Sequence, residues 1–361
     1  MTDEHVMDNP RAERVKKVAA LAGRPGRKKQ ELFLAEGPQP VREALKLWLA
    51  QYDAAPESHD PAADSPGTLP ELDALYFTPE ALEQHPDVTA LLDQARGVLF
   101  DPQAELPREA RFFLREATAD VLTAMSDAEA PQGMVAVCRI PPNEFEGLDS
   151  LMVGFTESQV VVHADGSTER GETAHHGSVT LAPVLLGLQD PGNVGTLIRT
   201  ADAAGAGAVV LGPGTADPWS PKVVRSAVGS HFHLPVFAGI DPEQLTRFAR
   251  DNGIQVLAAD GSGDTALDGL DQEALRTPTL WLLGNEAHGL SPEQKALADT
   301  RISIPLYGQA ESLNVAVAGA LCLYATAMAQ RNATAAPDAP LPLLSEDHEG
   351  FAPLHRHQEA P

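Results

Sequence analysis

The chain has 361 residues, enough for two domains with sizeable cores. Its net charge of -25 and its pI near 4.7 disfavour a polyanionic partner for the surface as a whole. The two cysteines, Cys138 and Cys322, form no CxxC pair or Cys/His cluster, so we expect neither a disulfide framework nor a metal site. The N-terminus lacks an apolar signal core, and the apolar run 315–329 falls short of the roughly 18 to 20 residues that span a bilayer. We therefore expect a soluble, cytoplasmic protein.

Basic residues are concentrated between positions 11 and 30, where Glu13 is the single acid. A local basic face on an acidic protein can bind RNA, with an affinity that depends on salt. The alternative is a solvated helix face without a partner. The candidate RNA-binding residues in this segment are Arg11, Arg14, Lys16, Lys17, Arg24, Arg27, Lys28 and Lys29.

Alternating β and α patterns follow a leader over residues 1–10, which we expect to be flexible. The segment 32–50 predicts a short strand, a turn, and a helix with Val41, Leu45 and Trp48 on one face.

Further strands are predicted from about Ala74, Gly97 and Gly133, with helical or capped segments such as 107–126 between them. Together these elements indicate a compact α/β domain over residues 11–140.

Three segments have the composition of loops. Residues 51–73 contain six acids and four prolines but no Lys or Arg, which indicates a solvated acidic insertion. Residues 141–178 are rich in acids, Gly and Ser and read as a linker or insertion with one strand near 159–164. Residues 331–361 turn to Ala, Pro and acids, so we expect a disordered tail.

Residues 179–330 predict a second domain in which strands alternate with helices, the pattern of a parallel sheet. The expected strands are 181–188, 208–212, 233–237, 254–259, 279–283 and 301–305.

Three of these strands lead into polar, glycine-bearing turns. The turns are Asn193-Val194-Gly195 with Arg199, Gly284-Asn285-Glu286 with Gly289, and Ile304-Pro305 followed by Glu311-Ser312-Leu313-Asn314. The first turn precedes a helix, as a phosphate-binding loop does, but it lacks the GxxxxGK[ST] pattern. No GxGxxG opens a helix after the first strand either, which disfavours a nicotinamide-dependent enzyme.

The third turn opens an apolar helix over 315–329. Ser312 or Asn314 can supply its N-cap. Because the helix has almost no polar side chain, we expect it to be buried against the sheet, a partner chain, or both. The polar residues before it are then placed in a crevice. A capped core helix without any chemistry is the alternative.

The order and spacing of the three turns resemble the three motifs of the SpoU (TrmH) family of RNA ribose methyltransferases, over roughly residues 180 to 330. The resemblance implies an α/β fold of the SPOUT type, a parallel-sheet domain with a deep trefoil knot. The preceding domain is similar, more loosely, to a small ribosomal-protein-like RNA-binding domain. S-adenosyl-L-methionine as cofactor and a homodimer are also implied.

The resemblance carries residue roles with it. The catalytic set would be Arg199, Asn193, Glu286, Ser312 and Asn314, and the cofactor would lie against Leu283, Gly284, Ile304, Leu306 and Leu313. Lys222 and Arg225, three residues apart on one predicted helical face, match a segment that faces the RNA. An exposed, salt-bridged helix is the alternative for that pair.

The family scheme has a ribose 2′-hydroxyl attack the methyl group, with arginine proposed as the base. Deprotonating a guanidinium at neutral pH costs more than about 7 kcal/mol, so we expect Arg199 instead to bind a phosphate and stabilise the developing alkoxide. Neither cysteine is placed as the nucleophile that pyrimidine C5 methylation needs. By family analogy ribosomal RNA is favoured and transfer RNA is possible as substrate; a non-catalytic RNA-binding protein that retains the knotted fold is the alternative.

Overall fold

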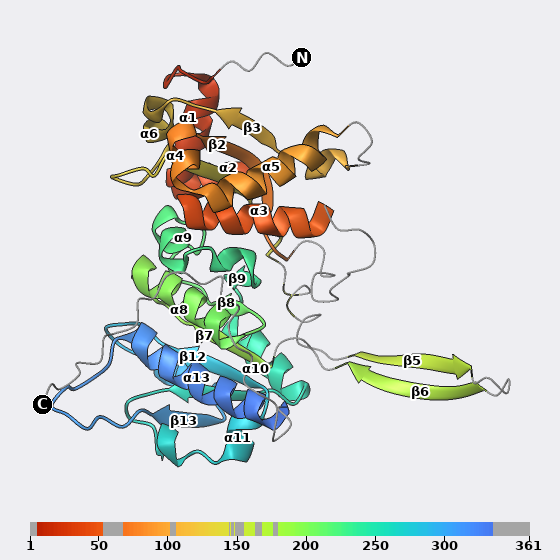
Figure 1. Ribbon diagram of the computed structural model, residues 1–361. Coiled ribbons are helices and arrows are strands. Elements are labelled where there is room, and N and C mark those ends of the chain that lie inside the picture. The colour runs from red at the N-terminus through yellow and green to blue at the C-terminus, as the bar shows by residue number, and fades with distance from the viewer. Residues whose placement is uncertain are drawn as a thin grey trace, which may run out of the picture.

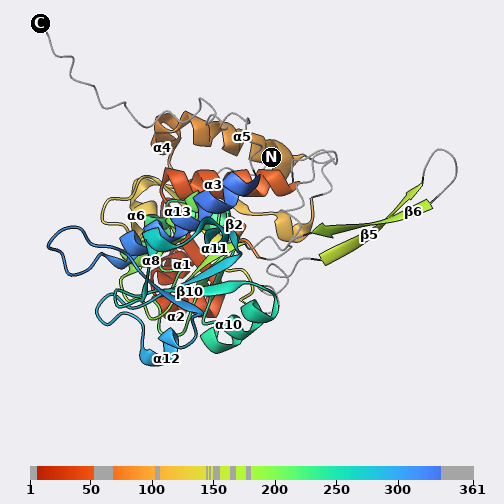
Figure 2. The same cartoon turned by 90° about the horizontal axis from the view of Figure 1, so that it is seen from below.

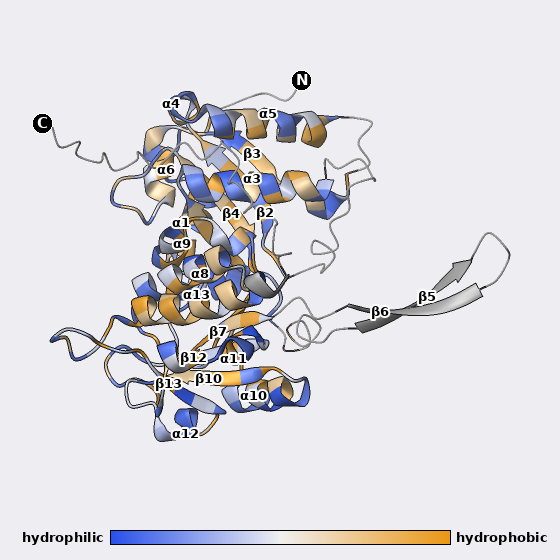
Figure 3. Cartoon of the chain, turned by 60° about the horizontal axis from the view of Figure 1, so that its bottom comes forward, coloured by the Kyte–Doolittle hydropathy of each residue, from blue (hydrophilic) through white to orange (hydrophobic). Residues whose placement is uncertain are grey.

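The computed structural model describes residues 6–52, 68–101, 106–143, 145, 148, 155–162, 168–175 and 180–334, with backbone alone for the two segments between 155 and 175. Most of the predicted acidic insertion and of the predicted tail lies outside these residues. The chain forms two α/β domains, stacked in Figure 1, and a separate hairpin. Figure 3 shows that the strands of both sheets are largely hydrophobic where helices cover them.

The N-terminal domain is built on a four-stranded sheet with the order β1-β4-β2-β3. Its strands are β1 (Leu32–Glu36), β2 (Glu71–Phe77), β3 (Phe113–Glu116) and β4 (Met134–Arg139). β4 pairs antiparallel with β1 and β2, and β2 pairs parallel with β3. The alternation of side chains along each strand supplies both faces of the sheet with apolar residues.

Helices cover both faces of this sheet. Phe33 and Ala35 of β1 face the cluster that contains α3 (Pro38–Tyr52) and α5 (Pro86–Phe100), and Leu34 faces the opposite cluster. The opposite side holds α1 (Glu13–Ala19) and α6 (Ala119–Met125). The remaining helical elements of this domain are η1 (Ala20–Ala22), α2 (Arg24–Gln30), α4 (Pro79–Gln84) and η3 (Arg108–Ala110). Val41, Leu45 and Trp48 are buried on α3 as predicted.

Two sequence predictions in this domain were wrong. The strand expected from Gly97 is the last turn of α5, whose buried residues Val88, Leu92, Ala95 and Leu99 follow helical spacing. Nothing lies within 4 Å of a Cβ built on Gly97, so the glycine marks an open helix surface and no strand. Conversely, β3 lies inside 107–126, which we expected to be helical or capped; its four residues are too few to show an alternation.

The C-terminal domain has a seven-stranded sheet with the order β11-β13-β10-β12-β7-β8-β9, and every neighbouring pair is parallel. The strands are β7 (Leu181–Leu185), β8 (Val209–Leu211), β9 (Val236–Ala238), β10 (Gln255–Ala259), β11 (Thr265–Ala266), β12 (Thr279–Leu283) and β13 (Thr300–Ser303). Each of the six predicted strands is confirmed; 279–283 has the predicted bounds, the other five are shorter, and β11 was not predicted. The chain runs outward from β7 to β9 and then crosses to the other side of β7. The strand order therefore reverses between β7 and β12, where open parallel sheets bind ligands.

Two layers of helices enclose this sheet. One face packs against α8 (Pro191–Ala204), α9 (Pro221–Ala227) and α13 (Val315–Thr334), and the other against α10 (Pro242–Asp251). Shorter elements are η4 (Ser230–Phe232), η5 (Leu267–Gly269), α11 (Gln272–Arg276) and α12 (Pro292–Lys295). No helix in the described part of the chain is long and apolar enough to span a membrane.

The helix α13 approaches the sheet and α8 very closely. A Cβ on Gly319 would lie 2.5 Å from Cδ2 of Leu197 and 2.8 Å from Cδ1 of Leu283, so any larger residue here would displace these leucine side chains. Nearby, Nε1 of Trp281 donates a buried hydrogen bond of 3.0 Å to Oγ1 of Thr326. The inner face of α13 is therefore buried as predicted.

An antiparallel hairpin, β5 (Phe155–Val162) and β6 (Thr168–His175), lies between the two domains in sequence. Figures 1 and 2 show it projecting away from both domains. The single strand predicted near 159–164 thus overlaps β5, and its partner was not predicted.

The two domains pack through an aromatic cluster. Phe33 lies 4.9 Å from Trp219 and 6.3 Å from His231, measured between ring centroids. Burial lowers the pKa of His231 to about 4, against a backbone hydrogen bond to Pro218 that opposes the shift. His231 is therefore a neutral member of the core at neutral pH.

A second histidine at this interface is charged. Nδ1 of His233 lies 2.7 Å from Oδ2 of Asp202 on α8, and Nε2 lies 3.2 Å from Oε2 of Glu43 on α3. The hydrogen bonds to Asp202 and Glu43 raise the pKa of His233 to about 9, although burial opposes them. The imidazolium thus bridges the two domains.

This bridge predicts how stability depends on pH. Because the pKa of His233 is raised on folding from 6.5 to about 9, its stabilisation is complete below pH 6.5 and is lost as pH rises towards 9. The side chain is 41% exposed, so screening limits the loss to about 1 kcal/mol. Urea denaturation at pH 6.5 and 9 should show this loss in the wild type but not in His233→Gln; equal losses in both proteins would contradict the assignment.

Candidate functional site

A pocket of about 650 Å³ lies where the strand order reverses, outside the carboxyl ends of β7 and β12. Three segments meet there: the turn from β7 into α8, the loop after β12, and the residues before α13. The lining residues are Gln189, Asp190, Asn193, Asn285, Glu286, Ala287, His288, Ser312, Leu313, Asn314 and Val315. The three polar turns of the sequence are therefore assembled into one site.

The carboxylate of Glu286 joins the loop after β12 to the start of α8. Its Oε2 accepts the backbone N–H of Gln189 at 3.0 Å, and its Oε1 accepts the backbone N–H of Asp190 at 3.0 Å and Nδ2 of Asn193 at 3.2 Å. Partial burial by itself would raise the pKa of Glu286, but these hydrogen bonds lower it below its usual value. Glu286 is therefore ionised and committed to holding the turn.

Asn193 extends this network to the third segment. Its Oδ1 accepts Nδ2 of Asn314 at 3.0 Å, while Oδ1 of Asn314 accepts the backbone N–H of Ala316 at 2.8 Å. Asn314 is thus the N-cap of α13, one of the two candidates from the sequence. The hydrogen bonds from Glu286 to Asn193 and from Asn193 to Asn314 link all three motif segments through side chains.

Two helices begin at the pocket. Asp190 is the N-cap of α8, and its carboxylate accepts the backbone N–H of Gly192 at 2.6 Å. Asn314 has the same role for α13. Backbone N–H groups and the positive ends of both helix dipoles are therefore directed to one place, which favours negative charge there.

The loop after β12 closes tightly on itself. Asn285 and Gly289 exchange two backbone hydrogen bonds, 3.1 and 2.9 Å long, and Gly289 has φ +66°. A Cβ on Gly284 would lie 2.4 Å from the backbone of Gly289 and Leu290. Gly284 and Gly289 therefore permit the tight turn of this loop.

Helix α9 packs against the first turn of α8. A Cβ on Gly195 would lie 2.6 Å from the carbonyl oxygen of Val223, so the glycine permits the close approach of the two helices. Nζ of Lys222 on α9 lies 3.8 Å from Oδ1 of Asp190 at the rim of the pocket. Lys222 is therefore an exposed cation beside the site.

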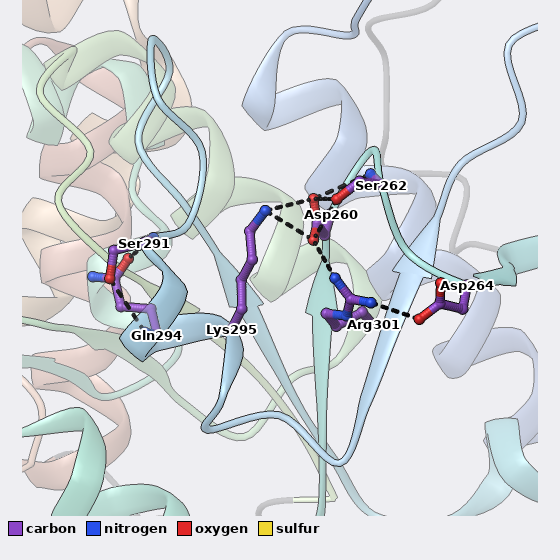
Figure 4. A network of polar contacts seen from close by, with 7 residues as sticks. All are labelled: Asp260, Ser262, Asp264, Ser291, Gln294, Lys295 and Arg301. Atoms are coloured by element: carbon purple, nitrogen blue, oxygen red, sulfur yellow. Dashed lines mark hydrogen bonds and ion pairs between the residues drawn. The ribbon is translucent and has the colours of Figure 1, made fainter.

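An ion cluster stabilises the bases of the two later loops. Asp260, at the end of β10, accepts Nζ of Lys295 on α12 at 3.0 Å and lies 3.7 Å from the guanidinium of Arg301 on β13. Figure 4 shows this cluster with Ser262 and Asp264 and, beside it, the capping box of Ser291 and Gln294 that opens α12. Because α12 follows the loop after β12 and β13 precedes the loop into α13, the cluster fixes both.

The structure brings four of the five predicted catalytic residues to the pocket: Asn193, Glu286, Ser312 and Asn314. The fifth, Arg199, is exposed on α8 and is absent from the lining. It has no ion-pair partner within the described part of the chain, and Asp202, which follows it on α8, pairs with His233. The Arg199 guanidinium is thus available to a ligand or to another chain.

Only some of the predicted cofactor-binding residues lie at the pocket. Leu313 lines the pocket and Gly284 begins the tight loop beneath it. The side chain of Leu283 is fully buried against Gly319 in the core, and the cofactor contact of this residue stays a prediction. Ile304 packs at the edge of the core, and Leu306 is 41% exposed outside the pocket lining.

Two predicted RNA-binding residues are corrected by their contacts. Arg27 is 4% exposed and pairs with Asp217 at 2.7 Å, and Arg225 pairs with Glu36 at 2.8 Å and with Asp127 at 2.9 Å. Both guanidinium groups therefore hold the domains together. The remaining predicted cations of the N-terminal segment are exposed: Arg11, Arg14, Lys16, Lys17, Arg24, Lys28 and Lys29.

Arg14 differs from these other exposed cations. Its Nε donates a hydrogen bond of 2.8 Å to the hydroxyl of Tyr76, and its guanidinium lies 3.6 Å from the centroid of the Phe113 ring. These two contacts fix the position of the Arg14 guanidinium on the basic face.

Sequence reasoning missed Gln189, Asp190 and Asn285 as site residues. Gln189 and Asp190 donate backbone N–H groups to Glu286, and Asp190 also caps α8 through its carboxylate, for which an Asp before Pro191 is the available signal. Oδ1 of Asn285 accepts the backbone N–H groups of Ala287 and His288, and its Nδ2 donates to the carbonyl of Gly187. An asparagine that opens a glycine-bearing loop is the available signal for such a turn.

Comparison with known proteins agrees with this geometry. The family described as "SpoU rRNA Methylase family" matches residues 181–324. The 23S rRNA (guanosine(2553)-2′-O)-methyltransferase RlmP of Bacillus subtilis is 37% identical over 57% of this chain and 68% of its own length. The 23S rRNA (uridine(2479)-2′-O)-methyltransferase of Streptomyces viridochromogenes is 33% identical over 63% of this chain and 74% of its own.

A solved structure extends the likeness to both domains. The SpoU methyltransferase AviRb from Streptomyces viridochromogenes, in complex with the cofactor AdoMet, is 26% identical and has a TM-score of 0.61. The match covers 89% of this chain and 100% of that one. The predicted fold class is confirmed, and the knot itself stays a prediction.

The tight loop after β12 predicts the effect of one methyl group. Gly284→Ala places a Cβ against backbone atoms of the same loop, which cannot move aside as a flexible side chain would. We expect a loss of about 1 to 3 kcal/mol in the free energy of unfolding, measured by urea denaturation. Gly261→Ala is the control, because nothing lies within 4 Å of its Cβ; equal stability of the two variants would show that the loop can relax.

Proposed function

Because this chain belongs to the SpoU rRNA Methylase family, we propose that it transfers a methyl group from S-adenosyl-L-methionine to a ribose 2′-hydroxyl of structured RNA. The observation that carries the proposal is the network Glu286–Asn193–Asn314, which joins the three motif segments around one pocket. Ribosomal RNA is the favoured substrate class, since the relatives compared above are named as 23S rRNA methyltransferases.

The pocket fits a cofactor of this size and chemistry. Its volume lies within the range of about 300 to 1,000 Å³ found for small-molecule sites. Leu313 and Val315 offer apolar contact, and the loop Asn285–Gly289 with the backbone of Gly284 forms the rigid wall. The bound cofactor would supply an electrophilic methyl group. The role of the protein is then to place the ribose oxygen and to stabilise the charge that develops on it.

The N-termini of two helices can stabilise negative charge on the ribose oxygen. As the 2′-hydroxyl oxygen takes the methyl group, it would release its proton to solvent water; negative charge grows on the oxygen meanwhile, and the N-termini of α8 and α13 face the pocket in which it would lie. Ser312 and Asn314 present polar side chains that can orient the ribose. The Glu286 carboxylate already accepts three hydrogen bonds from Gln189, Asp190 and Asn193, so we assign it to holding the site together and not to proton abstraction.

Arg199 is proposed to bind the phosphate beside the target ribose. Its exposed guanidinium suits bidentate contact with phosphate oxygens, and an arginine base would have to give up a proton at a cost of more than about 7 kcal/mol. The exposed cations of α1 and α2 would hold more distant phosphates, with a strong dependence on salt.

A test of the reaction and of Arg199 is methyl transfer from labelled S-adenosyl-L-methionine to ribosomal and transfer RNA made without this protein, followed by digestion to nucleosides. The wild type should yield a 2′-O-methylnucleoside. Arg199→Ala should lower turnover by about a hundredfold or more while cofactor affinity changes little. Equal losses in turnover and cofactor affinity would refute the role of Arg199, and cofactor binding without transfer to either RNA would favour the non-catalytic RNA-binding alternative.

A homodimer is proposed from α13. Its outer face carries Val317, Leu321, Tyr324 and Met328, each 42 to 57% exposed and spaced to form one apolar stripe. An exposed apolar stripe of this kind on a helix is typical of a protein–protein interface. Since α13 starts at the pocket and packs against α8, a second copy seated there would also lie close to Arg199.

Leu321→Arg tests the dimer. A charge in the centre of the stripe should convert a dimer to a monomer in sedimentation velocity and should lower methyl transfer. Phe100→Arg is the matched control, because Phe100 is an equally apolar, 64% exposed side chain on α5 of the other domain. A Leu321→Arg protein that stays dimeric, or a monomer that retains full activity, would contradict the proposal.

A further inference from the structure

The buried Arg27 connects the basic N-terminal segment to the C-terminal domain. Its Nη1 donates to the carbonyl oxygens of Leu21 and Ala22, both at 2.8 Å, at the end of η1. Its Nε and Nη2 donate to Oδ2 of Asp217 at 3.1 and 2.7 Å. One guanidinium therefore fixes the turn between α1 and α2 and attaches it to the loop that holds Asp217.

That loop is bound along its length to the end of β7. The hydroxyl of Thr215 accepts the backbone N–H of Gly187 at 3.0 Å. The backbone N–H of Ala216 donates to the carbonyl of Leu188 at 2.8 Å. The residue next to Asp217 is thus in direct contact with the turn that leads into the pocket.

The next residue of that turn belongs to the site. The side chain of Gln189 donates to the carbonyl of Gly214, and its backbone N–H donates to Glu286. The contacts from Arg27 through Asp217 to Glu286 are continuous, and each is a hydrogen bond or a peptide link. Arg27 itself belongs to α2, and this helix also carries the exposed cations Arg24, Lys28 and Lys29. These three are the cations nearest to Arg27 in sequence.

We propose that Arg27 and Asp217 are positioning residues that set the distance and orientation between the RNA-binding cations of α2 and the methyl-transfer pocket. The proposal rests on the proposed function. Neither side chain is placed to touch the RNA or the reacting atoms: Arg27 is 4% exposed and the Asp217 side chain 19%. The pair acts by keeping two separate contacts of one RNA in register, so that a nucleotide held by α2 through its phosphates presents the correct ribose to the pocket.

The test uses Asp217→Asn in the full chain. This change keeps an oxygen that can accept the backbone N–H of Trp219 but removes the charge that faces Arg27. Asp127→Asn is the matched control: it removes the same charge from another interdomain ion pair, with Arg225, and Asp127 lies outside the loop that contacts the pocket turn.

Three quantities are measured for both variants and the wild type: the affinity for in vitro transcribed large-subunit ribosomal RNA, the affinity for S-adenosyl-L-methionine, and the single-turnover rate of methyl transfer, with the methylated positions mapped. Asp217→Asn should bind the RNA and the cofactor as the wild type does, yet transfer methyl about ten- to a hundredfold more slowly, because a displacement of about 1 Å is enough for such a loss. Methyl groups on neighbouring nucleotides should appear, and Asp127→Asn should behave as the wild type.

Each contrary result has a separate meaning. An unchanged rate in Asp217→Asn, or a loss in step with RNA affinity, overturns the positioning role while an active wild type leaves the proposed function intact. Equal losses of rate in Asp127→Asn also overturn it, because they indicate general loosening of the interface. Absence of transfer by the wild type to any RNA overturns the proposed function itself.

Discussion

The candidate site depends on the hydrogen bonds that the Glu286 carboxylate accepts. Two come from backbone N–H groups at the start of α8 and one from Asn193, which in turn accepts from the N-cap of α13. Each such bond stabilises by about 1 kcal/mol. Their joint effect is geometric: three segments, of which the first is 93 residues from the second and 121 from the third in sequence, keep one relative position, and two helix N-termini face one pocket.

The topology of the sheet explains why these segments can meet. All seven strands are parallel, so their carboxyl ends lie at one edge, and the order reverses between β7 and β12. The loops after these two strands therefore diverge and leave space between them. Gly284 and Gly195 then allow the chain to come close enough to itself for the network to form.

Local patterns predicted six of the seven strands of the C-terminal domain, the helix α13 and a cap at Ser312 or Asn314, because burial and capping depend on neighbouring residues. Burial that results from contacts between domains cannot be predicted from neighbouring residues. Arg27 and Arg225 lie in segments whose basic residues are typical of RNA-binding surfaces. Their ion-pair partners Asp217 and Glu36, however, are 190 and 189 residues away in sequence, where a local pattern does not reveal them. Leu283 ends a strand beside the site, but its side chain is fully buried and packs against Gly319 of α13, a contact between elements that the local pattern does not show.

The central claim is that the three segments act as one unit through Asn193. The most direct measurement is a double-mutant cycle of single-turnover methyl transfer with Glu286→Gln and Asn314→Ala, two positions that each contact Asn193. If one network holds the site, the double variant should lose little more rate than the more impaired single variant. If the two losses multiply, the residues act independently and the account is wrong.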